Sequence, residues 1–188
     1  MKTKLVAPTK AQIEAWKKEH NCKVVYKITS EDGKVAYIKD PVSDLKIMKM
    51  ATTALQKSDS LYVQVVLNQC WLDGDDEIKE QEEYGAGLVN QLNNITEIPN
   101  AIITREGSKY IMEVEGVKIE VRAAKRADVL LAEQKNRANE PFETNIHLLD
   151  IIKITDIKDI KKDSRVYIGF LAALDDVKNK VAVAVEKL

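Results

Sequence analysis

The stretch "EIKEQEEYGAGLVNQLNNI" at residues 77–95 matches "DIKKDSRVYIGFLAALDDV" at residues 159–177 without a gap, at an offset of 82 (159 minus 77). The match aligns Gly87 with Gly169 and keeps the apolar positions in phase. Because chance can produce some identities, we also compared the elements that precede each copy. Both copies follow a hairpin pattern and helical patterns, so we predict an α+β protein made by tandem duplication of a ββααα unit.

Residues 1–95 are predicted to hold an N-terminal helix and the first ββααα unit. The segment "PTKAQIEAWKKEH" has a capping-box spacing and a helical apolar face, which predicts a helix over about 9–20. In "KVVYKITSEDGKVAYIKDP" (23–41), the turn-forming "EDG" separates two β-rich runs, which predicts a β-hairpin. Three helices are expected to follow: one from Ser43, one capped by Asp59 or Ser60, and one over about 78–95.

Residues 96–188 are predicted to hold the second unit, after "TEIPN" interrupts the helical pattern with Pro99. The hairpin "KYIMEVEGVKIEVRAA" (109–124) aligns with the first one at an offset of 83, and "NAIITREG" (100–107) predicts an extra strand that makes a three-stranded meander. The expected helices run from Ala124 to Ala138, from Pro141 to about Ile154, and from Ser164 to the C-terminus.

The C-terminal segment "VKNKVAVAVEKL" prolongs the helical rhythm of the last helix through Val181, Val185 and Leu188. A continuous helix from Ser164 would contain 25 residues and measure about 37 Å at 1.5 Å per residue. A two-layer unit of this size does not easily cover such a helix. We therefore predict that these three apolar residues contact a protein partner.

The acidic stretch "NQCWLDGDDEIK" (68–79) is a candidate cation site. A calcium loop of the EF-hand kind needs Gly at its sixth position and Glu at its twelfth, and this stretch provides neither when counted from Asp73. We instead expect Gly74 to end one helix and Asp75 or Asp76 to cap the next. Since the second copy lacks the acidic cluster, Trp71, Asp73, Asp75 and Asp76 are predicted to form a partner-binding surface.

No other pattern predicts a metal, a cofactor or a catalytic nucleophile. His20 and His147 have no partner at a zinc-ligand spacing. Cys22 and Cys70 lie in or beside apolar runs and have no evident activating base, so we expect buried free thiols. We therefore predict no metal, no cofactor and no enzymatic activity.

The segment "YGAGLVNQL" (84–92) resembles the start of a dinucleotide-binding loop, but it lacks the third glycine and follows an acidic helix rather than a strand. The alternative is that Gly85 and Gly87 let two helices approach closely. We adopt this packing interpretation.

Composition narrows the function further. With 29 Lys and Arg against 30 Asp and Glu, the net charge of -1 disfavours a dedicated nucleic-acid binder. The longest apolar runs are far shorter than the roughly 20 residues that span a bilayer, so no membrane partner is expected and the protein is expected to be soluble. Few cysteines and no signal peptide favour a reducing cytoplasm.

Residues 9–95 carry a family resemblance. The segments "QIEAWKKEH", "KVAYIKDP" and "NQCWLDGDDEI" resemble a group of small uncharacterised proteins of tailed phages that infect gut Bacteroides. More loosely, a hairpin followed by a Pro-started helix and short helices is similar to the tail assembly chaperones of siphophages and myophages. Those chaperones hold tape measure or tail tube subunits before assembly. Neither group implies catalytic residues.

The resemblance implies a non-enzymatic binding and assembly module of a phage. Its role would be that of a chaperone-like morphogenesis factor or a minor structural component of the virion, with a phage protein as partner and possible homo-oligomerisation. It would act in the cytoplasm of the host bacterium and could enter the virion. Two alternatives stay open: a host-takeover or anti-defence protein that inhibits a bacterial protein, and an enzyme that uses the acidic cluster with a divalent cation.

Overall fold

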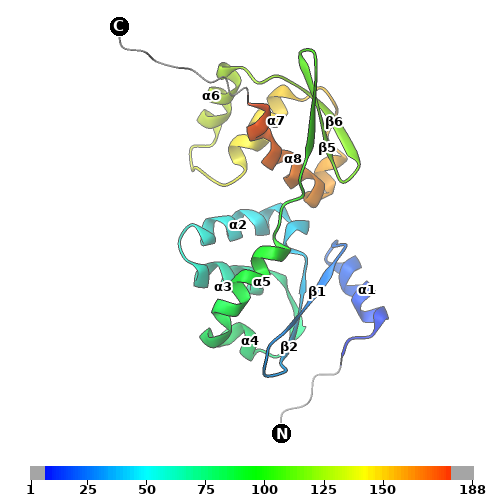
Figure 1. The fold of residues 1–188 in the computed structure, drawn as a ribbon, viewed down its shortest axis with the longest axis vertical. Coiled ribbons are helices and arrows are strands. Elements are labelled where there is room, and N and C mark those ends of the chain that lie inside the picture. The colour runs from blue at the N-terminus through cyan, green and yellow to red at the C-terminus, as the bar shows by residue number, and fades with distance from the viewer. Residues whose placement is uncertain (1–6, 179–188) are drawn as a thin grey trace. The chain divides into compact units, whose positions relative to one another are not determined.

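The computed structural model of the chain describes residues 7–178, which divide into two compact units between Glu97 and Ile98. Each unit contains a three-stranded antiparallel sheet and several helices (Figure 1). The predicted α+β class is therefore confirmed. The boundary predicted from the sequence, after residue 95, is two residues earlier.

Unit 1 is built around the sheet β1-β2-β3, in which β2 is the central strand. Two side chains of β2, Ala36 and Ile38, are fully buried and pack with the helices in the core. Tyr37 lies on the opposite face, as the period of a strand requires, and its ring centroid is 5.9 Å from that of Trp16 in the N-terminal helix. In chain order, the elements are α1 (Lys10–Glu19), β1 (Val25–Thr29), β2 (Val35–Lys39), η1 (Pro41–Ser43), α2 (Leu45–Leu55), α3 (Asp59–Cys70), β3 (Trp71–Gly74), α4 (Glu77–Glu80), η2 (Glu82–Tyr84) and α5 (Gly85–Ile95).

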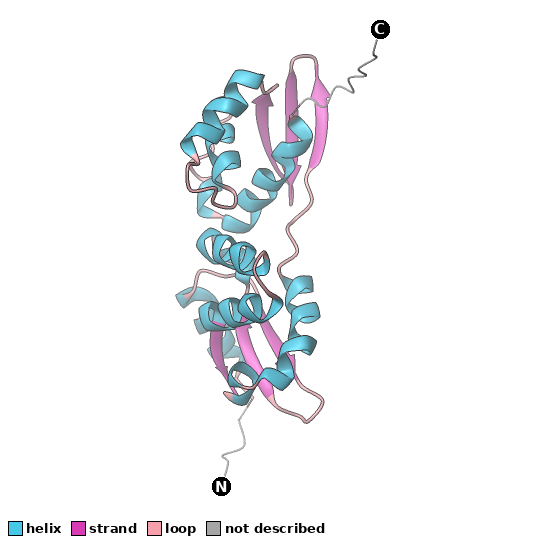
Figure 2. Ribbon diagram, turned by 90° about the vertical axis from the view of Figure 1, so that its left-hand side faces the viewer, coloured by secondary structure: helices cyan, strands magenta, loops and turns pink. Residues whose placement is uncertain are grey.

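Unit 2 is built around the meander β4-β5-β6, and its helices lie against the sheet (Figure 2). The predicted extra strand is confirmed, because β4 pairs with β5 over five residues. Alternate residues of β5 are buried, which leaves its other face half-buried or exposed. In chain order, the elements are β4 (Ile102–Glu106), β5 (Lys109–Val114), β6 (Val117–Arg122), α6 (Arg126–Lys135), α7 (Glu143–Ile152), η3 (Ile160–Lys162) and α8 (Ser164–Val177).

Two predicted helices are interrupted in the structure. Two others begin differently, because Ser58 and not Asp59 or Ser60 caps α3, and α7 begins at Glu143 and not at Pro141. The helix expected over 78–95 is broken into α4, η2 and α5, because the backbone of Gln81 is extended (ψ 128°). The last helix, α8, ends at Val177, and the next residue, Lys178, is also extended (ψ 108°), so the helix does not continue unbroken through Lys178. The predicted contact residues Val181, Val185 and Leu188 lie outside the described residues.

The acidic stretch lies between α3 and α4, as predicted, but the junction contains a strand, β3, that was not predicted. Trp71 and Asp73 pair with β2, and Gly74 lies so close to it that an added Cβ would be 2.6 Å from the Cα of Ala36. This close approach explains the glycine, whose φ of 151° is not a helical C-cap. Asp76 occupies the N-cap position of α4, as predicted, but its side chain makes no cap hydrogen bond.

The two units share one strand pairing at aligned positions. In unit 1, Ile38 pairs with Trp71, the first residue of β3. In unit 2, Val121 forms an isolated antiparallel bridge with Lys153, directly after α7. Val121 aligns with Ile38 at an offset of 83, and Lys153 aligns with Trp71 at an offset of 82. This pairing is what a duplication predicts, and the duplication itself stays an interpretation.

Candidate functional site

The side chains of the acidic stretch do not converge on one point. Asp75 Oδ2 accepts a hydrogen bond from the Val35 N–H at 2.8 Å, so this carboxylate satisfies a backbone donor of β2. Asp76 is 3.7 Å from the ammonium of Lys79, which also lies 4.9 Å from the ring centroid of Trp71. The carboxylate of Asp73 accepts from the next backbone N–H, at 2.9 Å. Residues 7–178 contain no group of three or more His, Cys, Asp or Glu arranged to hold a metal ion.

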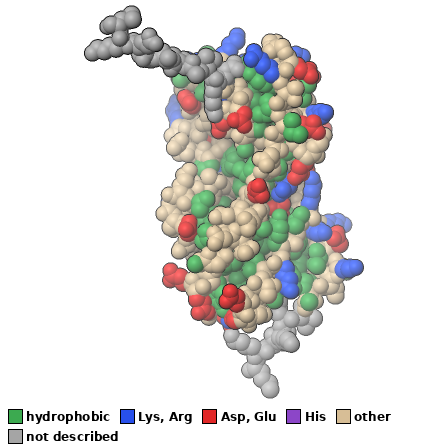
Figure 3. Space-filling view, viewed as in Figure 1, with side chains coloured by type: hydrophobic (Ala, Val, Ile, Leu, Met, Phe, Trp, Pro, Cys, Tyr) green, Lys and Arg blue, Asp and Glu red, His purple; other side chains and the backbone are tan. Residues whose placement is uncertain are grey.

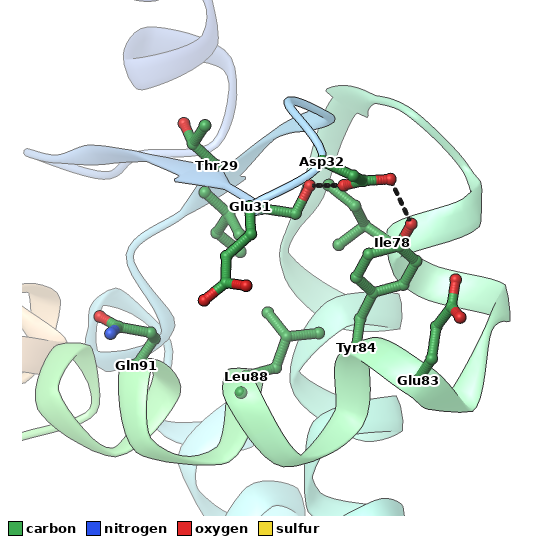
Figure 4. A pocket seen from close by; sticks show the side chains of 11 residues that line it. Thr29, Glu31, Asp32, Ile78, Glu83, Tyr84, Leu88 and Gln91 are labelled. Atoms are coloured by element: carbon green, nitrogen blue, oxygen red, sulfur yellow. Dashed lines mark hydrogen bonds between the residues drawn. The ribbon is translucent and has the colours of Figure 1, made fainter.

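A cavity of about 580 Å³ in unit 1 is the stronger candidate. It lies between the turn that follows β1 and the segment from η2 to α5 (Figure 4). Sequence reasoning did not find this site. Its lining residues are Ile28, Thr29, Ser30, Glu31, Asp32, Ile78, Glu83, Tyr84, Gly87, Leu88 and Gln91.

The floor of the cavity is apolar. Ile78 and Leu88 are only 2% and 5% exposed, and Ile28 is half-buried beside them. Leu88 points from α5 toward the hairpin turn in Figure 4. A ligand with a hydrocarbon portion would remove this surface from water, at about 25 cal/mol per Å² buried.

One wall is fixed by hydrogen bonds at the turn. The Tyr84 hydroxyl donates to Asp32 Oδ2 at 3.0 Å, and the Ser30 hydroxyl donates to Asp32 Oδ1. These bonds, led by that of Ser30, hold the pKa of Asp32 below its ordinary value, so this carboxylate is charged at neutral pH. Lys34 lies outside the lining, 3.8 Å from Asp32 and 3.6 Å from Glu77.

The remaining polar groups of the lining are free to meet a ligand. Glu31, Glu83 and Gln91 are exposed, and their side chains have no hydrogen-bond or ion-pair partner among residues 7–178. Figure 4 shows Glu31 extending from the turn toward α5. The lining contains three carboxylates and no Lys, Arg or His, so the cavity favours a positively charged group.

The aligned glycines differ between the units. An added Cβ at Gly87 would meet nothing within 4 Å, and the same is true at Gly85, so the predicted close helix packing is wrong at both. At Gly169, an added Cβ would lie 2.7 Å from Val114 Cγ1 and 3.0 Å from the carbonyl oxygen of Pro99. The close contact at Gly169 therefore joins α8 to strand β5 and not to a second helix, whereas Gly87 borders a cavity in unit 1.

The thiols do not contribute to this site. Cys70 is fully buried, which raises the pKa of its thiol to about 12, and Cys22 is 6% exposed. Both are free, as the sequence predicted. His147 lies 3.6 Å from the carboxylate of Glu143 in α7, away from the cavity lining.

The visible face of each unit carries acidic and basic side chains scattered among hydrophobic ones (Figure 3). Over residues 7–178, no helix combines the length and apolar character that crossing a bilayer requires. No protein-family model, curated protein or solved structure matches the chain.

Proposed function

We propose that this protein is a non-catalytic binding and assembly module of a tailed phage, and that the cavity of unit 1 receives a segment of its protein partner. The cavity carries the proposal. It combines an apolar floor with exposed, unpaired polar groups, and it lies where the aligned position of unit 2 is filled by packing. Such a combination is typical of binding sites, where apolar area supplies affinity and a few polar groups supply specificity.

The phage context comes from the resemblance of residues 9–95, which include all the residues that line the cavity. Within that context, the role is that of a chaperone-like morphogenesis factor or a minor virion component. The binding event takes place in the host cytoplasm, before or during particle assembly.

Mass spectrometry of purified virions and deletion of the gene test this role. Presence of the protein in virions supports a structural component, and its absence together with tail-less particles on deletion supports an assembly factor. Normal particles that lack the protein would overturn the proposal. Capture of a host protein with no phage protein would instead favour a host-takeover factor.

A pair of variants connects the role to the cavity. Gly87→Leu places a side chain in the cavity without a clash at Cβ, and is expected to abolish capture of the phage partner. Ala86→Leu is the matched control, because Ala86 is exposed in the same helix and does not line the cavity. Equal capture by both variants would contradict a role for this site.

A further inference from the structure

We propose that the cavity of unit 1 binds an arginine or lysine side chain of the partner segment; this inference rests on the proposed function and names the chemistry of its site. The starting point is an ion pair in unit 2. There, Arg165 Nε donates to Glu115 Oε1 at 2.8 Å, which joins α8 to the hairpin turn. The second unit therefore supplies its own cation to the carboxylate of its turn.

Unit 1 has no cation at the aligned helix position, and its turn carboxylate, Asp32, is instead paired with Lys34 of its own hairpin at 3.8 Å. At the offset of 83 in the hairpins, Glu115 aligns with Asp32, and at the offset of 82 in the helices, Arg165 aligns with Glu83. A carboxylate thus replaces the guanidinium, and the longer turn adds Glu31 as another acid. Lys34 pairs with Asp32 from outside the lining, whereas Glu31 and Glu83 have no cation among residues 7–178, so a cation from outside stabilises these two carboxylates.

The shape of the site selects a basic side chain over a metal ion. The carboxylates of the lining do not form a metal-holding group, and the floor between them is hydrocarbon from Ile28, Ile78 and Leu88. Lysine and arginine place their aliphatic stems on apolar surface and keep the charged head at a polar rim. The stem would lie on Leu88, and the head would reach Glu31, whose side chain extends into this space (Figure 4).

The neighbouring strand is an edge strand of its sheet. The sheet order β1-β2-β3 places β1 at an edge, and the last residues of β1 line the cavity. An extended segment beside this edge could insert one side chain between the turn and α5. We therefore assign the ligand to the class of extended basic peptides.

Titration of the ¹⁵N-labelled full chain with short peptides tests the inference. The probe is acetyl-Val-Arg-Val-amide, and its matched control carries citrulline, which has nearly the same shape as arginine but no charge. Only the arginine peptide is expected to shift the amide resonances of residues 28–32 and 83–91, with affinity at least tenfold above that of the citrulline peptide. Equal affinities, or shifts confined to other residues, would overturn the inference.

Variants separate charge from folding. Glu83→Arg installs the residue that unit 2 uses, so it is expected to weaken binding of the arginine peptide at least tenfold, and Glu31→Gln to weaken it several-fold. Glu82→Arg makes the same charge change at an exposed residue outside the lining and should weaken it less than threefold. Urea midpoints verify that each variant folds, and an equal loss in both arginine variants would refute the site.

Failure here is distinguishable from failure of the proposed function. If the arginine peptide does not bind but Gly87→Leu still abolishes capture of the phage partner, the cavity takes another chemical class and only this inference falls. If virions and deletion give negative results while the peptide binds as expected, the site stands and the phage role falls.

Discussion

The aligned glycines Gly87 and Gly169 should respond in opposite directions to the same substitution, Gly→Ala. At Gly87 the new methyl group meets nothing within 4 Å, and the backbone is in an ordinary helix. The gain comes from reduced entropy of the unfolded chain, about 0.4–1 kcal/mol. We expect a value near the lower limit, because Gly87 lies in the first turn of α5.

At Gly169 the same gain is opposed by packing. The methyl carbon would lie 2.7 Å from the side chain of Val114, which is fully buried, and 3.0 Å from a backbone oxygen. Overpacking a well-packed core destabilises by about 1–3 kcal/mol. Subtracting a helix-propensity gain of about 1 kcal/mol leaves a net loss of about 0–2 kcal/mol.

Urea denaturation can measure both effects separately. Trp16 and Trp71 are the two tryptophans of the chain and both lie in unit 1, so tryptophan fluorescence reports that unit alone. Far-UV circular dichroism follows both units. Destabilisation of unit 1 by Gly87→Ala would refute the open cavity, and stabilisation of unit 2 by Gly169→Ala would refute the tight contact with Val114.

Three further predictions concern single interactions. Asp75→Ala should destabilise unit 1 by about 1–2 kcal/mol in urea, because it leaves a strand N–H without its acceptor, whereas exposed Asp76→Ala should change it by less than about 0.5 kcal/mol. Asp128 accepts two hydrogen bonds from Arg122 and one from a backbone N–H, and together these lower its pKa to about 2. The charged carboxylate therefore stabilises the folded state fully above pH 3.8, and this stabilisation is lost as the pH falls toward 2. Asp128→Asn should therefore lower the Tm at pH 6 and flatten its fall between pH 4 and 2; an unchanged profile would contradict this. Cys70 should resist a thiol-specific reagent at pH 8 until urea unfolds unit 1, and rapid labelling in native buffer would contradict its burial.

The hairpins could be predicted because their determinants are local. Gly33 and Gly116 both have positive φ, 85° and 82°, in turns that glycine makes possible. The alternating apolar residues on each side of these turns then fix which face of the strands is buried. The extra strand β4 followed from the same kind of signal.

The strand β3 could not be predicted, because its cause is tertiary. "WLDG" contains four residues that become a strand only by pairing with β2, and its aspartates follow a pattern that also favours helix caps. The partner of Asp75 is the N–H of Val35, which is 40 positions away in the sequence. Local propensity contains no information about such a partner.

The cavity was missed because its signal was assigned to packing. Gly87 and Gly169 are identical in sequence, and the sequence therefore suggested the same role for both. The two glycines face different residues. Gly169 faces Val114 in unit 2, whereas Gly87 shares the cavity of unit 1 with Ser30, at the start of the turn. Only the pairing of the strands reveals that Val114 and Ser30 occupy corresponding places.

The length of the turn connects the pairing, the alignment and the site. In unit 1, the backbone N–H of Ser30 donates to the carbonyl oxygen of Lys34, and three residues separate the two. In unit 2, only two residues separate the paired Val114 and Val117. Because the turn of unit 1 has one more residue, the alignment of the two units has an offset of 83 after the turn and 84 before it. Ser30 then corresponds to Val114, as a duplication with a one-residue difference in the turn would predict. The longer turn of unit 1 contains two acids, Glu31 and Asp32, where the turn of unit 2 contains Glu115 alone. The longer turn of unit 1 thus accompanies both features that distinguish its site from unit 2, which are the open space beside Gly87 and the additional carboxylate of Glu31.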